Sequence, residues 1–373
     1  MTITLVAVVL LAACSRVSET PQFHAEGWPE HLSDWRLMKV EKGALVLNEG
    51  VRPYDLATPL FSDYALKLRT VTLPKGEAAT YDENEAFDFP VGTIVSKTFY
   101  YPQAGAEWTG DVSYKDASLK GPTAIDGAMA LQGLRLIETR LLVRRENGWV
   151  AIPYIWNDDQ NDARLARTGK IVKLTLHRPD GRAQAFNYLV PNQNQCAGCH
   201  GTNMNTRALS PIGLKARHLN KPSRFHPQID QLADWSAAGI LKGAPIDDTA
   251  PKNAIWMDAS ASVEARARSY LDVNCSHCHS DTGPADTSGL DLRPDIAFGP
   301  AAGLCKTPVA AGTGTGGRPY DIVPRHPDQS IFVYRMTTNE PGEMMPELGR
   351  SVSHEEGVAL IAEWISKMEG GCG

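Results

Sequence analysis

Two short runs of the 373-residue chain place cysteine and histidine at the same spacing. Residues 196–200 read CAGCH (the first motif) and residues 275–279 read CSHCH (the second motif). In a C-x-x-C-H pattern, two thiols form thioether bonds to one haem and the histidine binds its iron. Positions i, i+3 and i+4 share one helix face, so all three side chains can reach one porphyrin. We therefore predict two covalently bound haem c groups, with zinc or a disulfide as the ordinary alternative.

Each motif assigns its own cofactor residues. The expected thioether cysteines are Cys196, Cys199, Cys275 and Cys278, and the expected proximal iron ligands are His200 and His279. The second iron ligand of the first haem stays open among Met204, His218, His226, Met257 and a residue from elsewhere in the chain, and we prefer His218. His277, between the cysteines of the second motif, is expected at the surface.

The overall composition excludes one broad class of partner. The chain has 37 Lys and Arg against 43 Asp and Glu, and no basic run. Because nucleic-acid binding needs a positively charged surface, we expect no nucleic-acid partner. The length predicts two or three domains.

The N-terminus predicts export. Residues 3–13 are apolar except for Thr4, and the run is shorter than the ~20 residues of a membrane-spanning helix. The run ends in LAAC, which resembles a bacterial lipoprotein signal, although no Lys or Arg precedes it. We expect a signal peptide at 1–13, a lipid on Cys14 and a tether at 14–36, with an ordinary signal peptide as the alternative. Ser15 would permit outer-membrane sorting, so we expect a lipid-anchored protein on the periplasmic side of a bacterial membrane, the outer membrane favoured.

Two cysteines remain after lipid and haem are assigned. Cys305 and Cys372 have no other predicted use. Exported proteins meet oxidising conditions, so we expect a disulfide between them, with two free thiols as the alternative.

The region before residue 190 has the pattern of β-strands. Runs rich in β-branched and aromatic residues stand at 93–100, 134–145, 149–156, 170–177 and 182–190. Asn147-Gly148 and the PDG of 179–181 separate neighbouring runs, as in hairpins. We predict an antiparallel, sandwich-like β domain over 37–190.

Two polar features of this β region invite a functional interpretation. Residues 156–162 are rich in oxygen ligands, so calcium is conceivable, but the EF-hand spacing is missing and a solvated loop is favoured. Four arginines, Arg135, Arg140, Arg144 and Arg145, could meet haem propionates or an acidic partner; the ordinary alternative is the wet face of a strand.

The rest of the chain has helical patterns. Residues 191–258 form the first haem-binding segment, and 259–373 contain expected helices at 262–273, 328–336 and 354–368. The order of helix with C-x-x-C-H, loop, Met-Pro and closing helix resembles a class I cytochrome c domain. By that resemblance Met345 is the distal ligand opposite His279, with Met344 or neither as alternatives. The expected fold class is therefore multidomain: the β domain, followed by α-helical cytochrome c-type haem domains.

The whole chain resembles a poorly described family of exported bacterial dihaem c-type cytochromes. The resemblance rests on the two motifs and on PLFSDY (59–64), FPVGT (89–93), IETRLL (137–142), WNDDQ (156–160), VPNQNQ (190–195) and MPELG (345–349). It implies an exported dihaem protein with no assigned reaction. The β motifs also look like segments appended to bacterial sugar dehydrogenases that use pyrroloquinoline quinone, which hints at such a quinoprotein as redox partner.

Three functions are compatible with these patterns. The preferred one is electron transfer by two low-spin haems between a periplasmic dehydrogenase-type donor and a respiratory acceptor. The second is a dihaem oxidoreductase, such as a peroxidase, with an open first haem and a nearby acid–base group. The third is a β domain that binds sugar or a partner while the haems relay electrons.

Overall fold

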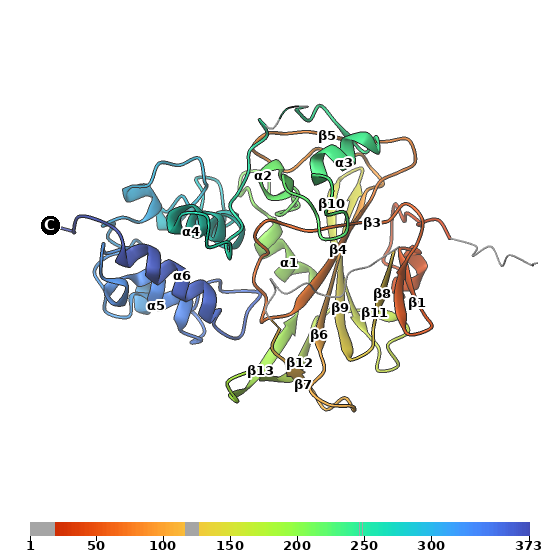
Figure 1. Cartoon of the computed structure of the whole chain (residues 1–373), viewed down its shortest axis with the longest axis horizontal. Coiled ribbons are helices and arrows are strands. Elements are labelled where there is room, and N and C mark those ends of the chain that lie inside the picture. The colour runs from red at the N-terminus through yellow and green to blue at the C-terminus, as the bar shows by residue number, and fades with distance from the viewer. Residues whose placement is uncertain (1–18, 116–126, 246, 248) are drawn as a thin grey trace, which may run out of the picture.

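The structure is a computed structural model that describes residues 19–115, 127–245, 247 and 249–373. The expected signal peptide and the lipid-bearing Cys14 lie outside the described residues. A β-rich part and a smaller group of helices near the C-terminus lie side by side, with helix α1 between them (Figure 1). Within the described residues, no helix is both long enough and apolar enough to cross a membrane.

The largest sheet has six strands in the order β11-β10-β9-β6-β4-β3, and all its pairs are antiparallel. Its strands are β3 (Arg52–Tyr54), β4 (Leu66–Thr72), β6 (Ile94–Pro102), β9 (Leu134–Arg145), β10 (Gly148–Trp156) and β11 (Ala163–Leu165). Gly148 pairs with Arg145, so Glu146-Asn147 form the two-residue turn of the β9–β10 hairpin.

Three smaller sheets surround the large one. Their strands are β1 (Met38–Glu41), β2 (Ala44–Leu47) and β8 (Ala128–Ala130); β7 (Asp111–Ser113), β12 (Lys170–His177) and β13 (Ala183–Val190); and β5 (Ala79–Thr80) with β14 (Leu241–Lys242). The pairs β7–β12 and β5–β14 are parallel. The β5–β14 pair joins the segment that follows the first motif to the β-rich part.

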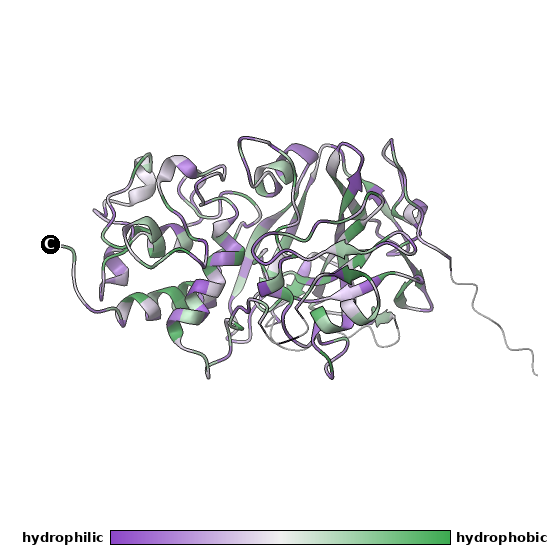
Figure 2. Cartoon of the chain, turned by 90° about the horizontal axis from the view of Figure 1, so that it is seen from above, coloured by the Kyte–Doolittle hydropathy of each residue, from purple (hydrophilic) through white to green (hydrophobic). Residues whose placement is uncertain are grey.

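The two faces of the large sheet pack in different cores. Leu68, Tyr100 and Tyr154 belong to a core that also contains Trp35, whose indole donates to the Tyr154 hydroxyl (2.7 Å). On the other face, Val95 and neighbouring apolar residues pack with the segment of the first motif. In the hydropathy view of Figure 2, strands and helices contain both apolar and hydrophilic residues, as elements with one buried face do.

The helices are short. They are α1 (Gln193–His200), α2 (Ala216–Leu219), α3 (Gln231–Ala237), α4 (Val263–Leu271), α5 (Ile331–Thr337) and α6 (Glu355–Ser366). The apolar stripe of α6 buries Ile361, Trp364 and Ile365 against Tyr270 and Leu271 of α4. This small core holds the C-terminal group together.

The expected fold class is wrong. The described residues form fourteen strands in four sheets and six α-helices, and an α-helical cytochrome c domain is not seen. Most of the chain between α4 and α5 forms turns and single-turn 3-10 helices, and α1 to α3 span only four to eight residues each. The sequence patterns locate individual elements, but they did not show that strand β14 ties the segment after the first motif to β5. The parallel pairs also depart from a purely antiparallel sandwich.

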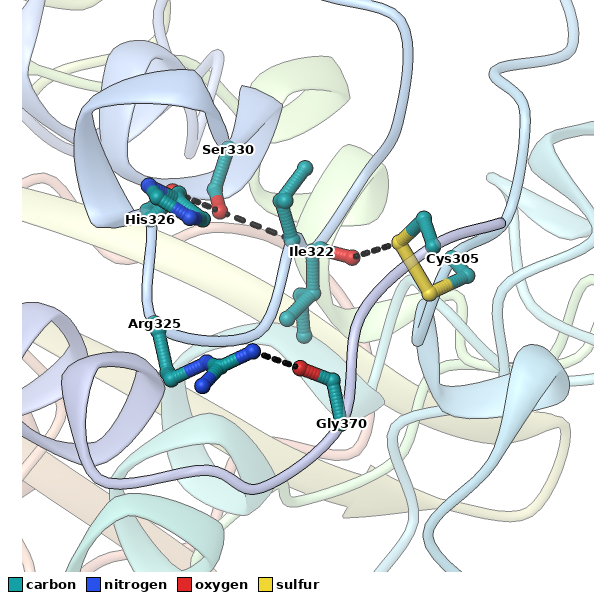
Figure 3. The surroundings of a disulfide bond; sticks show 8 residues. Cys305, Ile322, Arg325, His326, Ser330 and Gly370 are labelled. Atoms are coloured by element: carbon teal, nitrogen blue, oxygen red, sulfur yellow. Dashed lines mark hydrogen bonds between the residues drawn. A yellow bond between two sulfur atoms is a disulfide. The ribbon is translucent and has the colours of Figure 1, made fainter.

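A disulfide bond fixes the C-terminus. Cys305 and Cys372 are joined, with an S–S distance of 2.09 Å (Figure 3). Beside it, the Arg325 guanidinium donates to the Gly370 carbonyl (2.9 Å). The bond therefore ties the segment after α6 to the loop region before α5.

Removing this disulfide should lower stability. The two cysteines are 67 residues apart, and a closed loop restricts the unfolded chain. We expect the Cys305→Ser/Cys372→Ser variant to lose about 2–5 kcal/mol of unfolding free energy, measured by denaturant titration. If the variant unfolded at the same denaturant concentration as the oxidised wild type, the bond would have no structural role.

Candidate cofactor site

Helix α1 presents the first motif, and a polar cap fixes where it starts. The Asn192 side chain accepts from the Gln195 backbone N–H (2.9 Å), and the Gln195 side chain accepts from the Asn192 N–H (2.9 Å). Because the helix starts at this cap, Cys196, Cys199 and His200 all fall on α1 and share one face.

His200 has the hydrogen bond that suits an iron ligand. Its Nδ1 lies 2.8 Å from the carbonyl oxygen of Ser210, so Nδ1 donates and Nε2 is left for a metal. Burial lowers the pKa of His200 to about 4, which keeps the ring neutral. A neutral imidazole with a fixed tautomer is the form that binds metals.

The second motif begins where α4 continues into a π-helical segment at Asp272–Ser276. The Ser288 hydroxyl donates to the Ala285 carbonyl (2.6 Å) and therefore accepts from His279 Nδ1 (3.0 Å). This again leaves Nε2 of His279 for a metal. Burial lowers the pKa of His279 to about 4.

A buried polar network anchors the second motif. Asp272 accepts from Arg217 through Nε (2.7 Å) and Nη2 (3.0 Å), and from the Asn253 amide (2.7 Å). Burial raises the pKa of Asp272, but the Arg217 hydrogen bonds and neighbouring positive charge outweigh it and hold the pKa well below its usual range. Asn274 accepts from the backbone N–H of Phe61 (2.9 Å), which connects this segment to residues 59–64.

Both motifs open into one cavity of about 480 Å³. The predicted cofactor residues that line it are Cys196, Cys199, His200, Cys275, Cys278, His279 and Met345. The sheet supplies an apolar wall that includes Val95, Leu142 and Ala151. All four motif cysteines are free thiols. Free thiols, neutral histidines and an apolar wall are the groups that covalent haem attachment requires, so the residues fit this cofactor.

Met345 reaches the cavity from a loop with fixed backbone contacts. Its N–H donates to the Arg335 carbonyl (2.8 Å), and its own carbonyl accepts from Arg350 Nε (2.9 Å). The side chain is part-buried and lines the cavity, whereas Met344 is not among the lining residues. The geometry thus brings Met345, rather than its neighbour, to the motifs.

The candidates for the first haem's distal ligand lie elsewhere. Of Met204, His218, His226 and Met257, none is among the cavity-lining residues that the structure describes. Nδ1 of His218 is 3.3 Å from the Asn253 amide and its Nε2 is 3.5 Å from Asp272. The structure therefore does not bring His218 to the first motif.

Sequence reasoning missed several cavity residues, among them His277 and Lys97. His277, expected at the surface, lines the cavity, and burial lowers its pKa to about 3. Its Nδ1 is buried and has no hydrogen-bond partner among the described residues. Lys97 also lines the cavity, next to apolar Val95 in the wall. The alternation of β6 was a signal for Lys97, because residues 95 and 97 face the same side of a strand.

The other polar features have separate roles. Arg140 lines the cavity, whereas Arg135 forms an ion pair with Asp158 (2.7 Å). In the oxygen-rich loop, Asp162 accepts from both the N–H (3.1 Å) and the hydroxyl (2.9 Å) of Ser33. Asp162 therefore holds the N-terminal segment to this loop, whereas Asp158 holds the loop to β9.

A comparison with known proteins found no matching family model, no similar curated protein and no similar solved structure. The family resemblance of the sequence stays a prediction. Within the described ranges, no three His, Cys, Asp or Glu side chains converge as a metal site by themselves.

Asp272 gives a test of how the second motif is held. We expect Asp272→Asn to cost about 3–5 kcal/mol of unfolding free energy, because Arg217 would keep a buried charge without its partner. In the unfolded chain the pKa of an Asp is about 3.9, and the folded protein lowers the pKa of Asp272 below that value. Asp272 therefore stabilises the wild type at a pH above about 3.9, and this stabilisation is lost as the pH falls further.

Denaturant titrations between neutral and acidic pH would measure both effects. The variant should show a weaker loss of stability below about pH 4 than the wild type. Glu363→Gln, which breaks an exposed pair with Lys367, is the matched control and should change little. Equal losses in the two variants would contradict the anchoring role of Asp272.

Proposed function

We propose that the protein is an exported dihaem c-type cytochrome that transfers electrons between a dehydrogenase-type donor and a respiratory acceptor. One observation supports this most: the two C-x-x-C-H motifs, far apart in the sequence, line the same cavity together with Met345. Haem groups attached there would lie close to each other. Short separation favours passage of an electron through the protein.

The chain's own residues would bind, orient and shield the cofactor. Bound haem supplies iron that changes its valence by one electron. The cysteine pairs on α1 and on the π-helical segment and turn that follow α4 would fix each porphyrin, and His200 and His279 would be proximal ligands. Their Nδ1 hydrogen bonds set the ring orientation and raise the basicity of Nε2. The apolar wall would exclude water.

A haem peroxidase or related oxidoreductase is the second candidate function. The observation in its favour is that the four expected distal ligands of the first haem do not line the cavity. A haem without a sixth protein ligand can bind a small molecule at that position. His277, whose buried Nδ1 has no hydrogen-bond partner among the described residues, lines the same cavity and would be its acid–base group.

The partners and location belong to the same proposal. A lipid on Cys14 would hold the protein at the periplasmic face of the outer membrane. A quinoprotein sugar dehydrogenase is the proposed electron donor, on the likeness of the β motifs alone.

Spectroscopy of the purified oxidised and reduced protein separates the two functions. The electron-carrier function predicts two low-spin haems. Their spectra should not change when peroxide is added to the oxidised protein or carbon monoxide to the reduced protein. A high-spin component in the electron paramagnetic resonance spectrum that binds carbon monoxide would contradict the carrier and favour the enzyme.

Met345→Ala should alter only one haem. Met–His ligation raises the reduction potential, so losing the thioether should lower one midpoint potential and abolish the sulfur-to-iron charge-transfer band of the oxidised protein. Met344→Ala is the matched control, because Met344 is the neighbour that does not line the cavity. An unchanged charge-transfer band in Met345→Ala, or its loss in Met344→Ala, would exclude Met345 as the ligand.

A further inference from the structure

A row of three positive side chains crosses the cavity wall. Arg69 on β4 is directly opposite Lys97 on β6, and Lys97 is directly opposite Arg140 on β9. Directly opposed residues point to the same face of a sheet, and all three line the cavity. We call Arg69, Lys97 and Arg140 the cation row.

The cation row is unfavourable unless an anion faces it. Like charges directly opposite on neighbouring strands repel, and burial adds a desolvation cost. Only Arg140 has a carboxylate partner in the described chain, since it forms a bidentate pair with the buried Glu138 (2.8 and 2.6 Å). Nη2 of Arg69 is buried and has no hydrogen-bond partner among the residues that the structure describes.

Lys97 lies at the centre of the row, between Arg69 and Arg140. Among the described residues, its ammonium group has no hydrogen-bond or ion-pair partner, although it lies 5.1 Å from the ring centre of Phe99. Burial, together with the charges of Arg69 and Arg140, lowers the pKa of Lys97 to about 7. An anion at this place would relieve both effects.

The rest of the cavity lining does not supply that anion. The described lining has two more arginines, Arg335 and Arg350, and a single carboxylate, Glu347. Arg350 is already bound to the carbonyls of Met345, Arg335 and Thr338. The cavity as a whole is therefore positively charged.

We propose that the cation row is a binding site for carboxylate groups. Guanidinium groups bind carboxylates through paired hydrogen bonds, and an ammonium group between them adds a third donor. Two sources have this chemistry: the propionates of a haem attached at the first motif, or a free carboxylate ligand. Val95, two residues before Lys97 on β6, packs in one core with Cys196, and the row and the first motif line the same cavity, which favours the propionates. That assignment rests on the proposed dihaem function, whereas the carboxylate site itself does not.

The first experiment uses the full haem-loaded chain with Lys97→Gln. A positive charge beside a haem favours the reduced state, so its loss should lower the midpoint potential of one haem. We expect about a tenfold change in the reduction equilibrium, or about 59 mV for one electron, with the other haem unchanged. Lys97→Arg keeps the charge and should stay near the wild type. Lys173→Gln, on the exposed side of β12, removes an equal charge outside the cavity and should leave both potentials unchanged.

The second experiment titrates acetate at constant ionic strength and follows the thermal midpoint. If propionates occupy the row, acetate has no specific effect on the wild type. If the row serves a free carboxylate, acetate raises the thermal midpoint saturably, and Lys97→Gln abolishes the effect while Lys173→Gln retains it. This second pattern supports the site and overturns its assignment to propionates.

The two proposals fail in different ways. A chain without haem would end the dihaem function, and the acetate titration would still test the site. Two results together would overturn the cation row as a carboxylate site. The first is that Lys97→Gln leaves the haem potentials unchanged, or shifts them no more than Lys173→Gln does. The second is that acetate has no saturable effect on the thermal midpoint.

Discussion

The packing of one sheet face against both motifs is the constraint on which the site depends. Val95, Leu142 and Ala151 belong to the same core as Cys196 and Val273, which lie in or just before the two motifs. This shared core makes the motifs neighbours although the chain between them is mostly irregular. The Asp272–Arg217 pair then fixes the second motif against the segment that follows the first. Apolar packing brings the motifs together, and buried polar bonds set their orientation.

Local patterns in the sequence predicted individual elements well. The hairpin of β9 and β10 and the buried stripe of α6 follow from short-range rules of turn chemistry and helical period. The spacing within each motif likewise indicated which side chains share a face. These features depend only on neighbouring residues, so a single sequence contains them.

Long-range pairings were not predictable in the same way. The parallel pairing of β14 with β5, and the cross-strand alignment of Lys97 with Arg140, depend on residues distant in the sequence. The prediction of helical haem domains was wrong because short helical patterns do not reveal how the intervening loops pack. His277 lies in the cavity for a related reason, since the turn after the π-helical segment points it inward. The opposed charges of the wall break the usual rules of sheet pairing, and such local conflicts are expected where a protein binds a ligand.

The central claim is that each motif attaches one haem in the shared cavity. The most direct test is the intact mass of the exported protein, measured for the wild type and for variants with Ser at Cys196 and Cys199 or at Cys275 and Cys278. The account predicts the added mass of two haem groups for the wild type and of one for each double variant. A wild-type mass equal to the polypeptide alone, or lower only by the hydrogens lost in forming disulfides, would contradict it.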